Sequence, residues 1–465
     1  MTLSTAPTNA ATGSQTREPS NLFYQTRGRR PLVARAEGIY FWDRDGKRYI
    51  DGSSGAMVAN IGHGNPRVLA AMRRQMEEAT FAYRLHFENE AAETLARRIA
   101  QRMPAHLDRV FFVSGGSEAV ESCIKLARQW AIAVGQGSRY KVISRYPSYH
   151  GGTLGALALT GYAPMTAPFA PMMREMPKIP APTCYLDRDG LDWEARGLRY
   201  AELLRDEIHR QGPETVLAFI MEPVGGASTG ALVAPDSYYA RVREICDEYG
   251  ILLILDEVMS GVGRTGRFLA AEHWNLRPDV VALSKGFAAG YAPLGAMVAD
   301  RRLVEPVLDK GGFIHGFTYA GNPLACAAGL AVLEEIETHD LMGNAARMGG
   351  LLKSRLASLA ERFPFIGDVR GLGLLLAFEL VADRDTLQPL PKDLNAHSRL
   401  VDLAYDKGLI IYSRRTRGGL EGDHFLVCPP MVVDEAQIEE IMALLTDSLA
   451  AFASEAGLPQ GNLGA

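Results

Sequence analysis

The sequence has few cysteines, no long apolar run and little net charge, and each shortage excludes a class of protein. The five cysteines among 465 residues are scattered and odd in number, so neither a disulfide framework nor a metal site with zinc spacing is expected. No stretch approaches eighteen consecutive apolar residues, and the amino terminus lacks a basic start with an apolar segment, so neither membrane insertion nor export is expected. A net charge of −5, spread along the chain, predicts no nucleic-acid or membrane surface. The sequence is therefore typical of a cytoplasmic protein.

The composition predicts one large core with a smaller second lobe. At 465 residues and 47% hydrophobic, the chain is long enough for both. Residues 1–20 are rich in Ser, Thr, Ala and Pro and are expected to be a disordered tail. Residues 66–330 are predicted to form the large domain, and 21–65 together with 331–465 to form the two parts of a small α+β domain.

Short apolar runs alternate with helical patterns through the central part of the chain. This alternation predicts an α/β fold whose large domain has a mostly parallel sheet flanked by helices. The strands of that sheet are expected at 110–113, 140–143, 216–220, 251–255 and 280–283. Outside it, we expect two short strands within 39–50 around an Asp-Gly turn, a helix near 323–337, a strand at 371–380 and a closing helix at 437–452.

Two of the predicted strands deliver ionisable residues at their carboxyl ends. The strand 251–255 is followed by Asp256, and the strand 280–283 by Ser284 and Lys285. The carboxyl ends of parallel strands form the ligand-binding edge of such sheets. A lysine amine and a carboxylate at that edge suit a pyridoxal phosphate enzyme, with Lys285 as the Schiff-base partner and Asp256 on the pyridinium nitrogen.

A phosphate site is predicted where the strand 110–113 ends. Ser114, Gly115, Gly116 and Ser117 follow it, and a helical pattern begins there. The glycines permit a tight turn, and the N–H groups of a helix start can bind an anion. Ser117 could bind the phosphate through its hydroxyl or could simply cap the helix.

Three further residues, Tyr149, Val258 and Glu222, are expected at the same edge of the sheet, and a fourth, Thr318, in a turn before a later helix. Tyr149 could cover one face of a flat cofactor ring, with Val258 on the other, or could sit half buried in a solvated loop. Glu222 could support the surroundings of the ring or be a surface carboxylate. Thr318 could donate to a phosphate or cap the following helix.

The run from Leu255 to Gly266, which reads LDEVMSGVGRTG, followed by Pro278-Asp279 and Ser284-Lys285-Gly286, resembles the signature of class III (omega) aminotransferases of pyridoxal phosphate fold type I. The similarity extends from about residue 24 to 449. The resemblance implies that Lys285 carries the cofactor, Asp256 pairs with its nitrogen, Gly116 and Ser117 bind its phosphate, Tyr149 stacks on its ring and Glu222 lies close by. It also implies a homodimer, in some relatives a tetramer, in which Thr318 reaches the phosphate of the neighbouring subunit.

The resemblance implies transfer of an amino group from an ω-amino acid or primary amine to pyruvate or a similar 2-oxo acid by a ping-pong mechanism. Aminomutases, racemases and decarboxylases of the same fold share the lysine, aspartate and phosphate set, so they remain alternatives. A non-catalytic pyridoxal phosphate-binding protein is an alternative from a different class.

The residues that choose the substrate are predicted from the same resemblance. Relatives place a mobile arginine in a late loop that here contains Arg414, Arg415 and Arg417, and Arg415 or Arg417 is the expected carboxylate clamp. Met57 and Gly152 fall where several amine transaminases carry larger residues, which predicts an enlarged pocket. Tyr83, with His86 and Phe87, is expected to line the pocket from the partner chain. A solvated basic run and a core methionine are the alternatives for the arginines and Met57.

Overall fold

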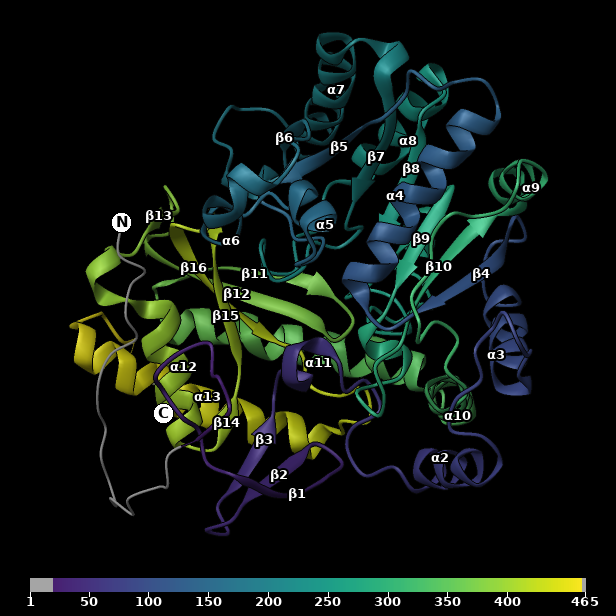
Figure 1. The fold of residues 1–465 in the computed structure, drawn as a ribbon. Helices are drawn as coiled ribbons and strands as arrows, with labels where there is room; N and C mark the ends of the chain where they lie inside the picture. The colour runs from purple at the N-terminus through teal and green to yellow at the C-terminus, as the bar shows by residue number, and fades with distance from the viewer. Residues whose placement is uncertain (1–19, 462–465) are drawn as a thin grey trace.

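A computed structural model describes residues 20–461, so the predicted tail lies outside the described residues apart from Ser20. The described chain forms a seven-stranded, a five-stranded and a four-stranded sheet, with helices packed around them (Figure 1). Within residues 20–461, no helix is both long enough and apolar enough to cross a bilayer. The same residues contain no cluster of three His, Cys, Asp or Glu side chains that could hold a metal ion.

The seven-stranded sheet confirms the predicted mostly parallel α/β core. Its order is β4 (Leu107–Val113), β10 (Gly295–Asp300), β9 (Val280–Leu283), β8 (Leu252–Asp256), β7 (Val216–Met221), β5 (Lys141–Tyr146) and β6 (Lys178–Pro180). β10, which was not predicted, runs antiparallel to β4 and β9, and the other pairs are parallel. Every residue of β7, β8 and β9 is buried, which explains why these strands are continuously apolar in sequence.

Helices cover both faces of this sheet. Ile254 and Val280 pack in one cluster with residues of α4 (Gly116–Ala133), whereas Leu253 and Leu255 pack in another with residues of α8 (Asp236–Tyr249). Successive strand residues therefore point to opposite helical layers. The remaining helices of the central region are α2 (Pro66–Glu78), α3 (Glu90–Ala100), α5 (Leu154–Leu159), α6 (Ala163–Thr166), α7 (Trp193–Gln211) and α9 (Arg301–Asp309).

The two ends of the chain meet in a second group of sheets, called here the small lobe. β3 (Arg48–Asp51) pairs in parallel with β14 (Leu409–Ile410), so the N-terminal strands lie beside C-terminal elements (Figure 1). The predicted pair of short strands within 39–50 is confirmed as β2 (Tyr40–Asp43) and β3, which pair antiparallel, and β1 (Val33–Glu37) extends their sheet. The short helix α1 (Ser54–Met57) follows β3.

The five-stranded sheet corrects one prediction. The segment 371–380 is not a single strand, because the chain turns at Gly373, whose φ of 54° lies in the left-handed region that favours glycine. It joins β11 (Ile366–Leu372) to β12 (Leu375–Asp383) as a hairpin. β16 (Glu421–Val427), β15 (Tyr412–Arg417) and the short β13 (Gln388–Pro389) complete the sheet.

The predicted helices near 323–337 and 437–452 are confirmed as α10 (Pro323–Thr338) and α13 (Glu435–Ala456). Asn322 caps α10 ahead of a proline at its first position, and Asp434 forms a capping box with Gln437 at α13. α11 (Leu341–Arg362) and α12 (Ala396–Asp406) lie between them in sequence. The predicted domain boundary at 330/331 falls inside α10, and the other boundaries stay predictions.

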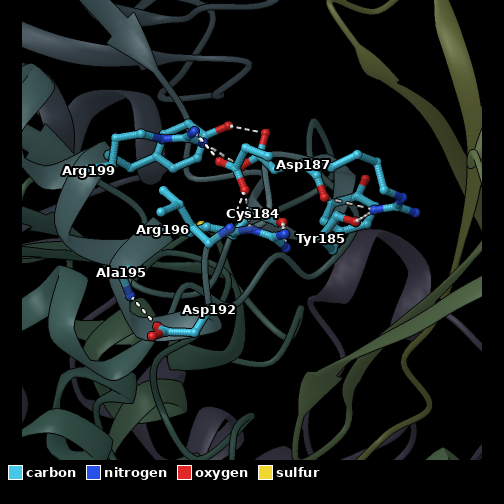
Figure 2. A network of polar contacts seen from close by, with 11 residues as sticks. Cys184, Tyr185, Asp187, Asp192, Ala195, Arg196 and Arg199 are labelled. Atoms are coloured by element: carbon cyan, nitrogen blue, oxygen red, sulfur yellow. Dashed lines mark hydrogen bonds and ion pairs between the residues drawn. The ribbon is translucent and has the colours of Figure 1, made fainter.

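A polar network fixes the loop between β6 and α7 (Figure 2). Asp187 pairs with Arg199 at 2.7 Å, Asp192 caps α7 by accepting from the Ala195 N–H, and Arg196 donates to the carbonyl of Cys184. The same loop carries Tyr185, whose hydroxyl donates to Glu379 of β12 at 2.7 Å. The network therefore connects the loop between β6 and α7 to the small lobe.

Candidate active site

The strand ends singled out in the sequence converge on one cavity of about 310 Å³. β8 ends at Asp256, Lys285 follows β9 after Ser284, and Glu222 follows β7 directly. Tyr149, three residues past β5, also reaches the cavity. Side chains from both lobes surround it, and the lining residues are Ala56, Met57, Gly116, Ser117, Tyr149, His150, Gly151, Tyr162, Met165, Glu222, Ala227, Ser228, Asp256, Val258, Met259, Lys285, Tyr412 and Arg414.

Asp256 is held by two hydrogen bonds, one at each carboxylate oxygen. The Nδ1 of His150 donates to Oδ2 at 2.8 Å, and the Val258 N–H donates to Oδ1 at 3.1 Å. Since a carboxylate accepts, the hydrogen of the imidazole lies on Nδ1. The Nε2 atom of His150 is buried and has no hydrogen-bond partner among residues 20–461. His150 was not singled out in the sequence, although it directly follows Tyr149.

Lys285 begins a short 3₁₀ turn immediately after β9 and faces the cavity. Its φ of 46° is in the left-handed region, an uncommon conformation for a non-glycine residue. Burial lowers the pKa of Lys285, while the negative charges of Asp256 and Glu222 act in the opposite direction. The ammonium form is thus less favoured here than in water.

Glycines at and beside the predicted phosphate loop leave space that a larger side chain would fill. α4 starts at Gly116, and a Cβ on Gly116 would lie 2.9 Å from a methyl of Val258. A Cβ on Gly151 would lie 2.7 Å from Ser117 Oγ, which accepts from the Gly152 N–H at 3.0 Å. Gly115, not Ser117, is the N-cap of α4, so the alternative that Ser117 merely caps the helix is wrong.

Glu222 is a buried carboxylate with one oxygen free. Its Oε1 accepts from the Gly226 N–H at 2.9 Å, and Oε2 has no hydrogen-bond partner among the described residues. At 5% exposure it is not a surface carboxylate, and burial raises its pKa. The unpartnered polar atoms of Glu222 and His150 fit a polar cofactor. The space left by the absent side chains of Gly116 and Gly151 fits a phosphate group, so the site as a whole fits pyridoxal phosphate.

Of the residues predicted to choose the substrate, Met57 is buried and lines the cavity, whereas Gly152 does not line it. Tyr83 and the exposed Thr318 also lie outside the cavity of their own subunit, and their predicted roles at the site of a partner subunit stay predictions. Arg415 pairs instead with Asp423 at 2.9 Å. Arg417 donates to the carbonyl of Leu387.

Arg414 is the member of the arginine run that lines the cavity. Neighbouring residues of a strand point to opposite faces, so Tyr412 and Arg414 of β15 share the cavity face while Arg415 points away from it. Its Nη1 donates to the Ser413 carbonyl at 3.1 Å, and no carboxylate among the described residues forms an ion pair with it. The sequence showed the cluster but not this orientation.

A buried network from the small lobe holds the loop that follows Glu222. Arg370 donates to the carbonyls of Thr229 at 2.9 Å and Gly230 at 2.7 Å. His424 Nε2 donates to the carbonyl of Ala227 at 2.8 Å, and its Nδ1 lies 2.7 Å from the Thr416 hydroxyl. Burial lowers the pKa of His424 to about 3, so the neutral ring is fixed as the Nε2–H tautomer. The cavity wall at Ala227 and Ser228 is thereby attached to the lobe that carries Arg414.

Comparisons with known proteins all find aminotransferases. The class III aminotransferase family model matches residues 24–449. An uncharacterised aminotransferase of Bacillus subtilis is 38% identical over 426 residues, which is 90% of this chain and 95% of that protein. A putrescine–pyruvate aminotransferase of Pseudomonas aeruginosa is 33% identical, covering 89% of each chain. The omega transaminase of Pseudomonas jessenii, solved in complex with pyridoxamine phosphate (PMP), is 32% identical with a TM-score of 0.87 and covers 92% of this chain and 94% of that one.

Proposed function

Because the chain belongs to the class III aminotransferases, a pyridoxal phosphate-dependent family, we propose that it moves an amino group from an ω-amino acid or primary amine to pyruvate or a similar 2-oxo acid. One observation carries the proposal. Lys285, the Asp256–His150 pair and a cationic Arg414 without a carboxylate partner among the described residues line a single cavity. Pyruvate as acceptor is supported by the relative from Pseudomonas aeruginosa.

The cavity contains a residue for each part of the cofactor. When bound, pyridoxal phosphate supplies a carbonyl that condenses with amines and a protonated ring that accepts the electron pair released at the substrate Cα. Lys285 would hold the carbonyl carbon and Asp256 the ring nitrogen. Gly116 and Ser117 would hold the phosphate, with Tyr149 and Val258 on the two faces of the ring and Glu222 beside it.

Lys285 is suited to moving a proton at the substrate Cα. A general base must be neutral before it can accept a proton, and burial lowers the pKa of this lysine toward the working pH. With the cofactor and an amine bound, the Lys285 Nζ would lie beside the substrate Cα. It would take the proton from that carbon.

Asp256 and His150 act as an electrostatic unit. The His150 N–H and the Val258 N–H orient the carboxylate by donating to its two oxygens. A carboxylate fixed in this position would pair with the ring nitrogen of the bound cofactor and favour its protonated form, which is the condition for electron withdrawal. Both side chains are buried, so water weakens this interaction little.

Arg414 is our candidate for binding the carboxylate of the 2-oxo acid, in place of Arg415 or Arg417. It lines the cavity without a competing ion pair among the described residues, whereas the Nε of Arg415 is occupied by Asp423. A guanidinium binds a carboxylate through two parallel hydrogen bonds. Met57 then faces the part of the cavity left for the donor's side chain.

A homodimer is also proposed. Leu85, Phe87, Ile314 and Tyr319 are large apolar side chains with exposures of 73%, 71%, 87% and 66%, and they flank Tyr83 and Thr318 in sequence. A partner covering these segments would bury the apolar groups and bring Thr318 to the neighbouring phosphate site. All five cysteines are buried and free, which supports a reducing, cytoplasmic location.

The test is a turnover assay of the cofactor-loaded protein with pyruvate and a panel of amines. 4-Aminobutanoate represents ω-amino acids and 1-phenylethylamine represents simple primary amines. Alanine formation with parallel double-reciprocal plots is the expected result. Conversion of more than one equivalent of an amine per active site without pyruvate, or release of carbon dioxide, would favour an aminomutase, racemase or decarboxylase, and no reaction with any amine would favour a non-catalytic protein.

A further inference from the structure

Two cavities adjoin at Tyr162. The active-site cavity of about 310 Å³ lies on one side, and a second cavity of about 530 Å³ lies on the other. Within residues 20–461, Tyr162 is the one residue that lines both, and it is 5% exposed. Tyr162 is therefore the point at which the two spaces adjoin.

The position of Tyr162 is fixed from two directions. It precedes α6, whose Met165 and Thr166 N–H groups donate to the Tyr162 carbonyl at 3.0 and 3.2 Å. Its hydroxyl accepts from the Arg415 N–H of β15 at 3.3 Å. α6 extends the same division, because Met165 lines the active-site cavity while Ala163 and Thr166 line the second one.

The lining of the second cavity includes Arg174 and Glu175, but part of it is suited to an apolar group. Leu157, Ala158, Ala170 and Met173 contribute hydrocarbon to it. The ammonium of Lys178, which also lines it, donates to the carbonyls of Ala158 at 2.7 Å and Met176 at 3.2 Å. Because those bonds engage its charge, Lys178 presents mainly its methylene chain to the space.

We propose that Tyr162 determines donor specificity by closing the active site toward this second cavity, which is a latent subsite for a long apolar substituent of the amine. In the wild-type protein the ring limits the length of that substituent. Removing the ring joins the two spaces and lets additional methylene groups become buried. This inference rests on the proposed transamination of primary amines.

The experiment uses the cofactor-loaded Tyr162→Ala protein and a homologous series of 2-aminoalkanes, from 2-aminobutane to 2-aminodecane, with pyruvate as acceptor. In the wild type, kcat/KM should stop rising with chain length once the substituent meets the ring. In Tyr162→Ala it should continue to rise, by about fourfold for each newly buried methylene. The ratio of kcat/KM for 2-aminooctane to that for 2-aminobutane should therefore increase at least tenfold.

Two variants serve as matched controls. Tyr162→Phe keeps the ring and loses one hydrogen bond, so it should keep the wild-type dependence on chain length. Met165→Ala enlarges the active-site cavity alone, so it should help branched donors without extending the length limit. Should Tyr162→Ala fail to fold, Tyr162→Leu gives the same comparison, with a smaller gain expected.

An unchanged length profile in a folded, cofactor-loaded Tyr162→Ala or Tyr162→Leu protein would overturn the inference. Thermal shifts induced by the same 2-aminoalkanes provide a readout without turnover. If the wild type transaminates none of these amines, the primary-amine part of the proposed function fails, while the ω-amino acid part is decided separately by the assay with 4-aminobutanoate. Even then, the longer amines should shift the melting temperature of Tyr162→Ala more than that of the wild type. Equal shifts for both proteins would contradict the proposal that Tyr162 closes the active site toward the second cavity.

Discussion

His150 and Asp256 form a buried pair at the centre of the site, with the imidazole Nδ1 donating to the carboxylate Oδ2 at 2.8 Å. The pair joins the loop after β5 to the end of β8, two strands that are not neighbours in the sheet. Under the proposed function this hydrogen bond restrains the charge that would face the cofactor nitrogen, so we expect both residues to affect catalysis through the same electrostatic interaction.

The first prediction concerns Asp256 itself. Asp256→Asn should leave the melting temperature close to that of the wild type, because the amide oxygen can still accept from His150. It should slow Cα–H cleavage by at least about a hundredfold, since a preorganised charge commonly contributes about 3 kcal/mol to the barrier. Single-turnover kinetics with a deuterated amine measure this step directly. A near-normal rate in a fully loaded variant would remove the electron-withdrawing role of Asp256.

Lys285→Ala should abolish turnover while noncovalent cofactor binding through Gly116, Ser117 and Asp256 persists. The attachment site can be located by borohydride reduction followed by peptide mapping. Lys178 is a suitable control because burial lowers its pKa as well, although it does not line the active-site cavity. Recovery of the pyridoxyl group on Lys178, or on any lysine other than Lys285, would contradict the central assignment.

Adjacent arginines of β15 should behave differently. Arg414→Ala should raise the KM for pyruvate, with a loss of about 1.5–3 kcal/mol for a charged hydrogen bond, and should spare the half-reaction with a donor that lacks a carboxylate. Arg415→Ala removes the ion pair with Asp423 and should mainly lower the melting temperature. If Arg415→Ala has the larger effect on the KM for pyruvate, the orientation of this strand does not decide acceptor binding.

Met57→Trp should penalise bulky donors, because the larger side chain fills space that Met57 leaves open beside the substrate. Pyruvate handling should be unaffected, since Arg414 is untouched. The measurement is kcat/KM for a bulky and a small amine at saturating pyruvate. An unchanged ratio between the two amines would show that Met57 does not contact the donor.

His424 predicts a pH dependence of stability. Its pKa is about 3 in the folded protein and about 6.5 when unfolded, so the unfolded state binds the extra proton between these values. Its contribution is therefore complete above pH 6.5 and is lost as the pH falls toward 3. Replacing His424 by Gln, which keeps an N–H for the Ala227 carbonyl, should flatten the decline of the melting temperature between pH 6.5 and 4. An identical slope in both proteins would contradict the assignment.

The functional residues at the strand ends could be predicted from the sequence, because a local pattern is enough to identify a buried strand and the residues that follow it. Buried parallel strands are continuous apolar runs, and Asp256 and Lys285 stand out by following such runs directly. Glycine at 116 is likewise visible, since a strand, a turn and a helix start follow one another in the sequence. The hairpin at Gly373 was missed because the residues next to the turn, Gly371-Leu372 on one side and Leu374–Leu376 on the other, are all apolar or glycine, so the turn produces no break in the hydrophobic pattern.

The sequence by itself determined the chemistry of this protein, because the edge of a parallel sheet collects the residues that end its strands. Tertiary structure decided which of several neighbouring side chains line the active-site cavity. Arg414 rather than Arg415 lines the cavity because the pairing of β15 with β16 sets the direction of each side chain, and Asp423 on β16 then binds Arg415. Tyr162 lies at the N-cap of the short helix α6 and contacts β15 through the hydrogen bond from the Arg415 N–H. No periodicity in the sequence encodes such a contact between distant segments.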